Sequence, residues 1–258
     1  MKRTLMKELV KWKDKPDRKP LLIQGARQVG KTWLIKEFGR LFYENTVYLN
    51  FEEKPELRKL FEKSLSADYL IEQISLFFGF DISKQGTLIV FDEIQTCPDA
   101  LTSLKYFDEQ RPDLHIVSAG SLLGVSLSRK TPFPVGKVNF LTLHSLSFYE
   151  FIFASGNEIL ADYLENISEK TTSSVVHDQL LELFRKYLFI GGMPEVVKSW
   201  VDSKDPQKVR EIQNEIIKAY QNDFSKYSSP AEAIKIAEVW KTIPSILSKE
   251  NKKFKYSD

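Results

Sequence analysis

The sequence has little of several features that would each narrow its function. It contains a single cysteine, Cys97, which excludes an intrachain disulfide and is typical of a reducing compartment. Its three histidines are scattered without metal-ligand spacing. No apolar run reaches the length of a membrane span, and a net charge of +2 gives no general attraction to nucleic acid or to membranes. We therefore expect a cytoplasmic protein that does not associate with membranes.

The bulk composition is that of an ordinary globular protein. The hydrophobic fraction is 42% and the charged fraction is 28%. A length of 258 residues allows one large or two small domains with a real core. Function must therefore be inferred from local motifs.

One eight-residue segment carries most of the functional information. It reads Gly25-Ala26-Arg27-Gln28-Val29-Gly30-Lys31-Thr32, which matches the pattern G-x-x-x-x-G-K-[ST]. It follows the apolar run 21–23 and precedes a helical pattern at 34–42, as a phosphate-binding loop requires. We expect its backbone amides to surround a phosphate at the positive end of the following helix.

The fixed positions of this loop have distinct predicted roles. The two glycines would allow backbone angles that a Cβ penalises. Lys31 would contact the β- and γ-phosphates, and the Thr32 hydroxyl would bind Mg²⁺. The alternative is a glycine-bearing turn, but a chance match in such a chain has odds of about one in a hundred. Residues 25–33, which include Trp33, are therefore predicted to bind a nucleoside triphosphate.

A second motif lies 61 residues after Lys31. The run 87–91 is apolar after its first residue and is followed by Asp92 and Glu93, which predicts a buried strand with carboxylates at its carboxyl end. Asp92 would hold Mg²⁺ through its water shell, and Glu93 would polarise the attacking water. The alternative is a buried strand that simply ends in a polar turn. A glutamate beside the aspartate favours hydrolases over small-molecule kinases and GTPases.

Strand and helix patterns alternate through the first half of the chain. The predicted strands are 21–23, 46–51, 87–92, 114–119 and 138–143. Helical patterns occupy 1–13, 34–42, 55–63, 67–79 and a segment beginning at Pro98. Such alternation predicts a three-layer α/β fold with a parallel sheet. From Ser147 onward only helical patterns remain. We therefore predict an N-terminal helix and linker (1–19), a P-loop core (20–146) and a helical domain (147–258).

The chain resembles AAA-type ATPases of the ASCE division of P-loop ATPases, namely the bacterial and archaeal members that carry a C-terminal domain of unknown function. The resemblance rests on five segments in the correct order: 22–32, 91–95, 119–121, 146–151 and 191–195. It implies ATP and Mg²⁺ as ligands and a sheet in the order 5-1-4-3-2. Members of this family continue well beyond this length, so we expect the helical domain to be incomplete here.

The implied strand order gives predicted roles to two further residues. The fourth strand would end between the first and third, where Ser121, or less favourably Ser118, would sense the γ-phosphate. The alternative for such a serine is a helix N-cap. Asn50 would end the second strand beside Glu93 and hold its carboxylate away from the water as a switch. The alternative is that Asn50 satisfies nearby backbone groups.

An arginine that would complete the site is harder to assign. Lys137 stands where the family resemblance leads us to expect arginine, and lysine lacks the planar bidentate phosphate contact. A neighbouring copy or another protein partner could supply the group, and Arg111 and Arg129 are candidates. Surface arginines are also commonly just solvated.

Three functions agree with these patterns. The first is an ATPase that couples Mg-ATP binding and hydrolysis to movement of its helical domain. The second is a nucleotide-gated regulatory module with negligible turnover. The third is a nucleic-acid motor that uses the basic, aromatic end at 249–256, although a solvated tail explains this end equally well. The segment 100–140 lacks the N/T-K-x-D pattern that reads guanine, which favours ATP.

Overall fold

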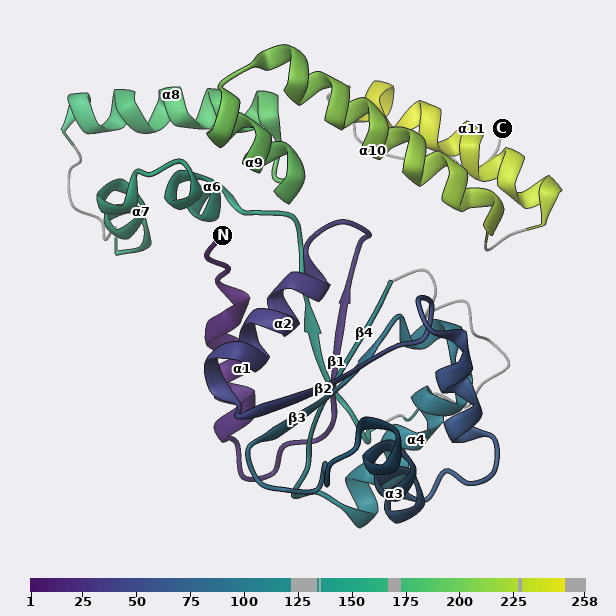
Figure 1. Cartoon of the computed structure of the whole chain (residues 1–258). Helices are drawn as coiled ribbons and strands as arrows, with labels where there is room; N and C mark the ends of the chain where they lie inside the picture. Colours follow the sequence, from purple (N-terminus) through teal and green to yellow (C-terminus); the bar gives the residue numbers. More distant parts are fainter. Residues whose placement is uncertain (122–133, 135, 167–172, 227–228, 249–258) are drawn as a thin grey trace. The chain divides into compact units, whose positions relative to one another are not determined.

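The chain forms a five-stranded parallel sheet (Figure 1). The computed structural model describes residues 1–121, 134, 136–166, 173–226 and 229–248. The strands are β1 (Leu21–Gly25), β2 (Asn45–Asn50), β3 (Thr87–Asp92), β4 (His115–Ser121) and β5 (Asn139–Thr142). They lie in the order β2-β3-β4-β1-β5, which confirms the predicted order 5-1-4-3-2.

Helices cover both faces of this sheet and make it a three-layer α/β fold, as predicted (Figure 1). The helices concerned are α1 (Leu5–Asp14), α2 (Lys31–Phe42), α3 (Ala67–Phe78) and α4 (Pro98–Gln110). Successive strand residues point to opposite faces. In β3, Val90 belongs to the core under α1 and α2, whereas Phe91 belongs to the core under α3 and α4. Burial on both faces explains the continuous apolar run of this strand.

The N-terminal helix α1 is part of the core. Leu9 and Trp12 are buried in the same hydrophobic cluster as the inner face of α2. The Trp12 ring lies 6.4 Å from that of Phe38, and its indole N–H donates to the Lys19 carbonyl at 2.8 Å. This packing fixes residue 3, just before α1, relative to the sheet.

The remaining helices are two 3₁₀ helices between the strands and a series of α-helices after the last strand. Two 3₁₀ helices, η1 (Pro55–Phe61) and η2 (Ile94–Thr96), lie in the connections of the sheet. After β5 come α6 (Phe148–Ala154), α7 (Glu158–Glu165), α8 (Ser174–Ile190) and α9 (Pro194–Ser203). After β5, the described residues form helices and no further strand. The glycine-containing segment 191–193 separates α8 from α9.

The chain divides into two compact units, Met1–Val209 and Arg210–Asp258. The second unit contains α11 (Pro230–Leu247) and most of α10 (Pro206–Lys226). In it, the Trp240 ring stacks on Tyr220 at 6.0 Å and meets Phe224 edge-on at 5.5 Å. Among the described residues, no helix combines the length and the apolarity that crossing a membrane requires.

Candidate functional site

The predicted phosphate-binding loop joins β1 directly to α2 at the carboxyl edge of the sheet (Figure 1). Gly30 has φ = 94°, so it needs the freedom of glycine, as predicted. Gly25 is required for a different reason: a Cβ there would clash with the Leu143 carbonyl oxygen. Gln28 also adopts a left-handed conformation, with φ = 62°. Such strain in a residue that has a Cβ is characteristic of functional loops.

Lys31 lies inside this loop. Its side chain is 8% exposed, and its ammonium donates to the carbonyls of Gly25 and Ala26 at 2.9 and 2.8 Å. Burial lowers the pKa of Lys31, and the nearby Glu93 and Asp92 carboxylates oppose that shift. The ammonium is thus held among backbone groups at the place where the motif predicts a phosphate.

Asp92 at the end of β3 faces the start of α2. Its Oδ2 accepts a hydrogen bond from the Thr32 hydroxyl at 3.0 Å and another from the Tyr48 hydroxyl. Its Oδ1 accepts from the Glu93 amide at 2.9 Å. Burial and then the bond to Asp92 raise the pKa of Tyr48, which keeps that phenol protonated. The structure thus brings together the two predicted metal-binding residues and adds Tyr48, which the sequence analysis missed.

Glu93 adopts an unusual backbone conformation. Its φ is 52°, in the left-handed region, where a residue with a Cβ is strained. The following η2 turn brings Gln95 back, and its amide donates to Glu93 Oε2 at 2.5 Å. Sequence patterns assigned no role to Gln95, although it lies two residues after Glu93. The bond from Gln95 fixes the orientation of the predicted general base.

Asn50 lies opposite Asp92 in the β2–β3 register, so its predicted neighbourhood is correct. Its Oδ1 accepts from the backbone amides of Glu52 and Glu53, both at 3.0 Å. These bonds belong to the backbone-capping alternative for Asn50. The predicted role of Asn50 as a switch on Glu93 stays a prediction.

The serines of β4 lie at two depths in the sheet. Ser121 is opposite Gly25 in the β1–β4 register, whereas Ser118 is opposite Leu22 and, across β3, Phe91. Both are buried, and Ser118 Oγ has no hydrogen-bond partner among the described residues. The register places Ser121, the preferred sensor candidate, at the level where the loop begins.

The basic candidates lie elsewhere. Arg111 binds the Asp113 carboxylate through Nε and Nη2, at 2.9 and 2.7 Å. Lys137 pairs with Asp108 and Glu109 at 3.3 and 3.1 Å. Lys137 precedes β5, and the first residue of β5 is opposite the first residue of β1. Lys137 therefore lies near the amino ends of these strands, whereas the loop follows the carboxyl end of β1. Arg129 and the basic end 249–258 fall outside the described residues.

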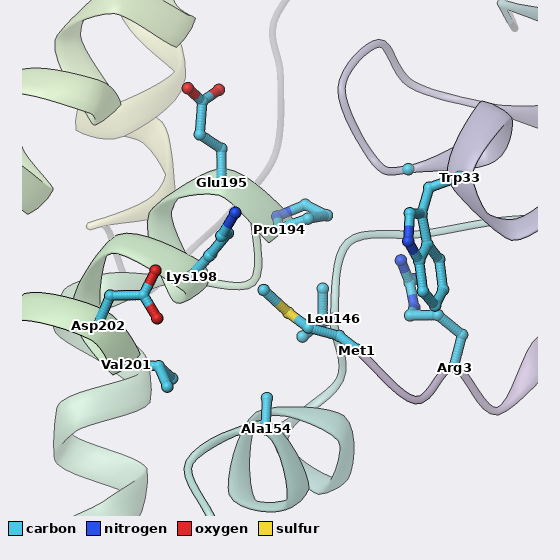
Figure 2. Close-up of a pocket in the computed structure, with 11 residues that line it drawn as sticks. Met1, Arg3, Trp33, Leu146, Ala154, Pro194, Glu195, Lys198, Val201 and Asp202 are labelled. Atoms are coloured by element: carbon cyan, nitrogen blue, oxygen red, sulfur yellow. The ribbon is translucent and has the colours of Figure 1, made fainter.

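A cavity of about 520 Å³ adjoins the loop (Figure 2). The N-terminal segment contributes Met1 and Arg3, the loop and first turn of α2 contribute Gly30 and Trp33, and α9 contributes Pro194, Lys198 and Asp202. The Trp33 side chain is 46% exposed. Apolar residues such as Trp33 and charged residues such as Lys198 thus both line the cavity beside the phosphate loop.

Comparison with known proteins identifies the family. Residues 17–152, more than half of the chain, match the AAA domain family. The chain belongs to this family. Within the AAA domain lie the loop, Asp92, Glu93, Ser121 and Asn50. Residues 181–258 match a domain of unknown function, DUF8612. No curated protein matches the sequence significantly.

Solved structures share the fold at low sequence identity. A Walker-type ATPase of Pyrococcus abyssi superposes with a TM-score of 0.50 and 14% identity, covering 94% of this chain and 76% of that one. AMPPCP-bound DnaA from Aquifex aeolicus gives 0.44 and 14%, with 86% and 67% covered. PCH-2 of C. elegans gives 0.42 and 14%, with 78% and 62% covered. The likeness to the Pyrococcus protein supports the fold alone.

Proposed function

We propose that this AAA protein is an ATPase that binds Mg-ATP at residues 25–33 and hydrolyses its β–γ phosphoanhydride bond. The observation that carries the proposal is the convergence of Lys31, Thr32, Asp92 and Glu93 at one edge of the sheet. In the proposed reaction, Glu93 takes a proton from a water whose oxygen attacks the γ-phosphorus. The bond to the β–γ bridging oxygen breaks, and ADP leaves.

The oxygen donors near the loop fit Mg²⁺. Thr32 Oγ1 and Asp92 Oδ2 lie 3.0 Å apart, and both are hard ligands of the kind this ion takes in small number while retaining waters. When bound, Mg²⁺ would neutralise charge on the β- and γ-phosphates. Thr32 and Asp92 would hold it, directly and through water respectively.

The cavity beside Gly30 and Trp33 would hold the nucleoside. Its opposite wall is α9, which contributes Pro194 and Lys198. A nucleotide in this position would touch both the AAA core and the helices that follow it. This gives the proposed coupling between hydrolysis and the helical part a physical basis. Because Lys137 pairs with Asp108 and Glu109 away from the loop, we further propose that a neighbouring copy or a protein partner supplies an arginine to the γ-phosphate.

Steady-state phosphate release by the wild type and by Glu93→Gln tests the proposal. The variant should keep ATP affinity and lose most hydrolysis, because an amide is a much poorer proton acceptor than a carboxylate. If the wild type binds ATP but releases phosphate no faster than the variant, the regulatory-module alternative replaces the ATPase. Salt-dependent anisotropy with labelled DNA separately tests the nucleic-acid alternative.

A further inference from the structure

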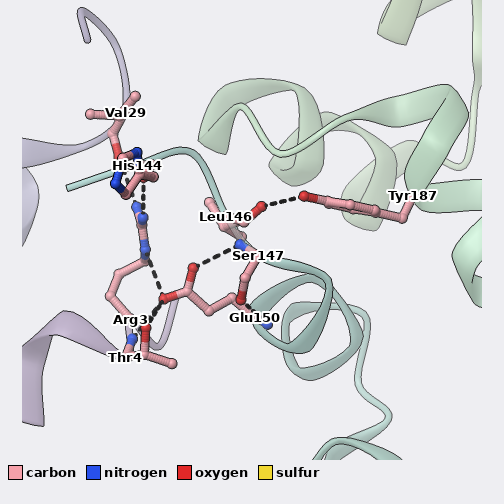
Figure 3. Close-up of polar contacts among 8 residues, drawn as sticks. All are labelled: Arg3, Thr4, Val29, His144, Leu146, Ser147, Glu150 and Tyr187. Carbon is pink, nitrogen blue, oxygen red and sulfur yellow. Dashed lines mark hydrogen bonds and ion pairs between the residues drawn. The ribbon is translucent and has the colours of Figure 1, made fainter. Parts of the chain in front are cut away.

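Arg3 reaches the phosphate loop from a distant part of the sequence. Its guanidinium donates to the Val29 carbonyl at 2.7 Å through Nη1 and to the His144 carbonyl at 2.5 Å through Nη2 (Figure 3). A Cβ built on Gly30 would lie 3.6 Å from the same Nη1, so the guanidinium also packs against the loop backbone. Arg3 therefore contacts the backbone of the loop and also lines the cavity beside it.

The contact to Val29 constrains the amide that follows it. The peptide unit is planar and trans, so the Val29 carbonyl and the Gly30 N–H point in opposite directions. A carbonyl held by Arg3 thus directs the Gly30 N–H away from Arg3. The positive charge of the Arg3 guanidinium beside that carbonyl also polarises the peptide unit and strengthens the Gly30 N–H as a hydrogen-bond donor. Gly30 is the N-cap of α2, where N–H groups lack partners within the helix.

Glu150 holds Arg3 in place. Its Oε1 lies 3.3 Å from Arg3 Nε, and both side chains are only 4% exposed. The same oxygen accepts from the amide and hydroxyl of Thr4 at 2.6 and 2.9 Å, and Oε2 accepts from the Ser147 amide at 3.0 Å in the N-terminal cap of α6 (Figure 3). The pair is buried, and the hydrogen bonds that Glu150 accepts from Thr4 and Ser147 hold its carboxylate beside Arg3. The first turn of α6 is thereby linked to the phosphate loop.

The helices after α6 join this arrangement. The Tyr187 hydroxyl of α8 donates to the Leu146 carbonyl at 2.8 Å (Figure 3). The Leu146 amide donates to the Gly192 carbonyl at 2.7 Å, and a Cβ on Gly192 would clash with the Leu146 backbone. The connection that carries His144 and Ser147 is therefore held by α8 and by the segment that begins α9.

We propose that Arg3 is a positioning residue for nucleotide binding. Arg3 orients the Gly30 N–H toward the phosphates, and the ion pair with Glu150 couples this orientation to the position of the start of α6. A displacement of α6 that separates Glu150 from Arg3 would release the Val29 carbonyl and weaken phosphate binding. The role in nucleotide affinity rests on the proposed function, whereas the effect on the loop itself does not.

Arg3→Lys and Glu150→Gln test this role, with Lys7→Gln as the matched control. Lysine keeps the charge but cannot reach two carbonyls and a carboxylate from one planar group. Glutamine removes the charge that holds Arg3, and its single amide oxygen keeps one acceptor, the one for Thr4. Lys7 lies on α1, and its ammonium pairs with Glu165 of α7 at 2.6 Å in an exposed contact that does not include the loop residues.

The first readout is amide hydrogen exchange in nucleotide-free protein. We expect faster exchange at residues 26–31 in Arg3→Lys and Glu150→Gln, and wild-type exchange in Lys7→Gln. Arg3→Lys should also weaken ATP binding about ten-fold, the effect of losing one charge-assisted hydrogen bond. If Arg3→Lys is unstable, Glu150→Gln provides the same comparison.

Two results would overturn the positioning role. Unchanged loop exchange in both variants would show that the loop does not depend on Arg3. Weaker ATP binding with unchanged exchange would instead show a direct contact between Arg3 and the nucleotide. If the wild type fails to bind ATP, the proposed function fails, but the exchange comparison still decides whether Arg3 orders the loop.

Discussion

The Thr32 hydroxyl donates to Asp92 Oδ2 at 3.0 Å, and this contact joins the start of α2 to the end of β3. Parallel strands that end at one edge bring the two residues together although 60 positions separate them. The pair forms a small set of oxygen donors beside the Lys31 ammonium. Among the described residues, no cluster of three or more carboxylate, histidine or cysteine ligands offers another metal site.

Asp92→Asn should remove the contribution of Mg²⁺ to nucleotide affinity, because the amide carries no charge to retain the hydrated ion. Titrations with ATP in Mg²⁺ and in EDTA should therefore give similar affinities for the variant and different ones for the wild type. Tyr48→Phe is the matched control, since it removes a donor to Asp92 and leaves the carboxylate. Mg²⁺ dependence that survives in Asp92→Asn would place the ion elsewhere.

Replacing Asn50 or Gln95 by alanine should have two different effects, one on stability and one on turnover. Asn50 Oδ1 binds two backbone amides, so Asn50→Ala should lower the free energy of unfolding by about 1 kcal/mol. Gln95 binds Glu93, so Gln95→Ala should change basal turnover at unchanged ATP affinity. Urea unfolding and phosphate release measure the two effects. A change in turnover with no loss of stability in Asn50→Ala would instead support the switch predicted from the sequence.

Ser121→Ala should slow hydrolysis about ten-fold, because it removes a hydroxyl at the level of Gly25. Ser118→Ala is the natural comparison, since that residue is opposite Leu22, three positions deeper in the sheet. We expect it to leave turnover near the wild-type value. Single-turnover rates measured at saturating ATP decide the matter, and equal rates for the two variants would remove the sensor role.

His115 should make the fold sensitive to mild acid. Burial, followed by the charges of Arg18 and Lys13, lowers its pKa to about 4, and its Nδ1 lies 2.6 Å from the Tyr43 hydroxyl oxygen. Between about pH 6.5 and 4 the unfolded chain binds a proton at this imidazole that the folded chain does not, so stability falls as pH falls.

Thermal melts between pH 7 and pH 4 check this expectation. His115→Gln should show a shallower loss of melting temperature than the wild type over that range. His177→Gln replaces an exposed histidine of α8 and should follow the wild-type curve. Identical curves for all three proteins would rule out His115 as the source of acid sensitivity.

The sequence predicted the parts of the site that short patterns encode. The loop 25–32 and the strand 87–92 each follow from one contiguous pattern, and the sheet order follows from the family resemblance. Arg3, Tyr48 and Gln95 were missed. Arg3 and Tyr48 act through contacts to residues 26 and 44 positions away, which no local periodicity reveals. For Gln95, only a strained backbone at Glu93 brings the amide back to the carboxylate.

Calorimetric titration of the wild type and Lys31→Ala with Mg-ATP tests the central claim most directly. Burial lowers the pKa of Lys31, so the folded protein disfavours its charge and we expect little loss of stability when it is removed. We predict saturable binding by the wild type and none measurable by Lys31→Ala, with closely similar melting temperatures. Equal ATP affinities for the two proteins, or no binding by the wild type, would contradict the account.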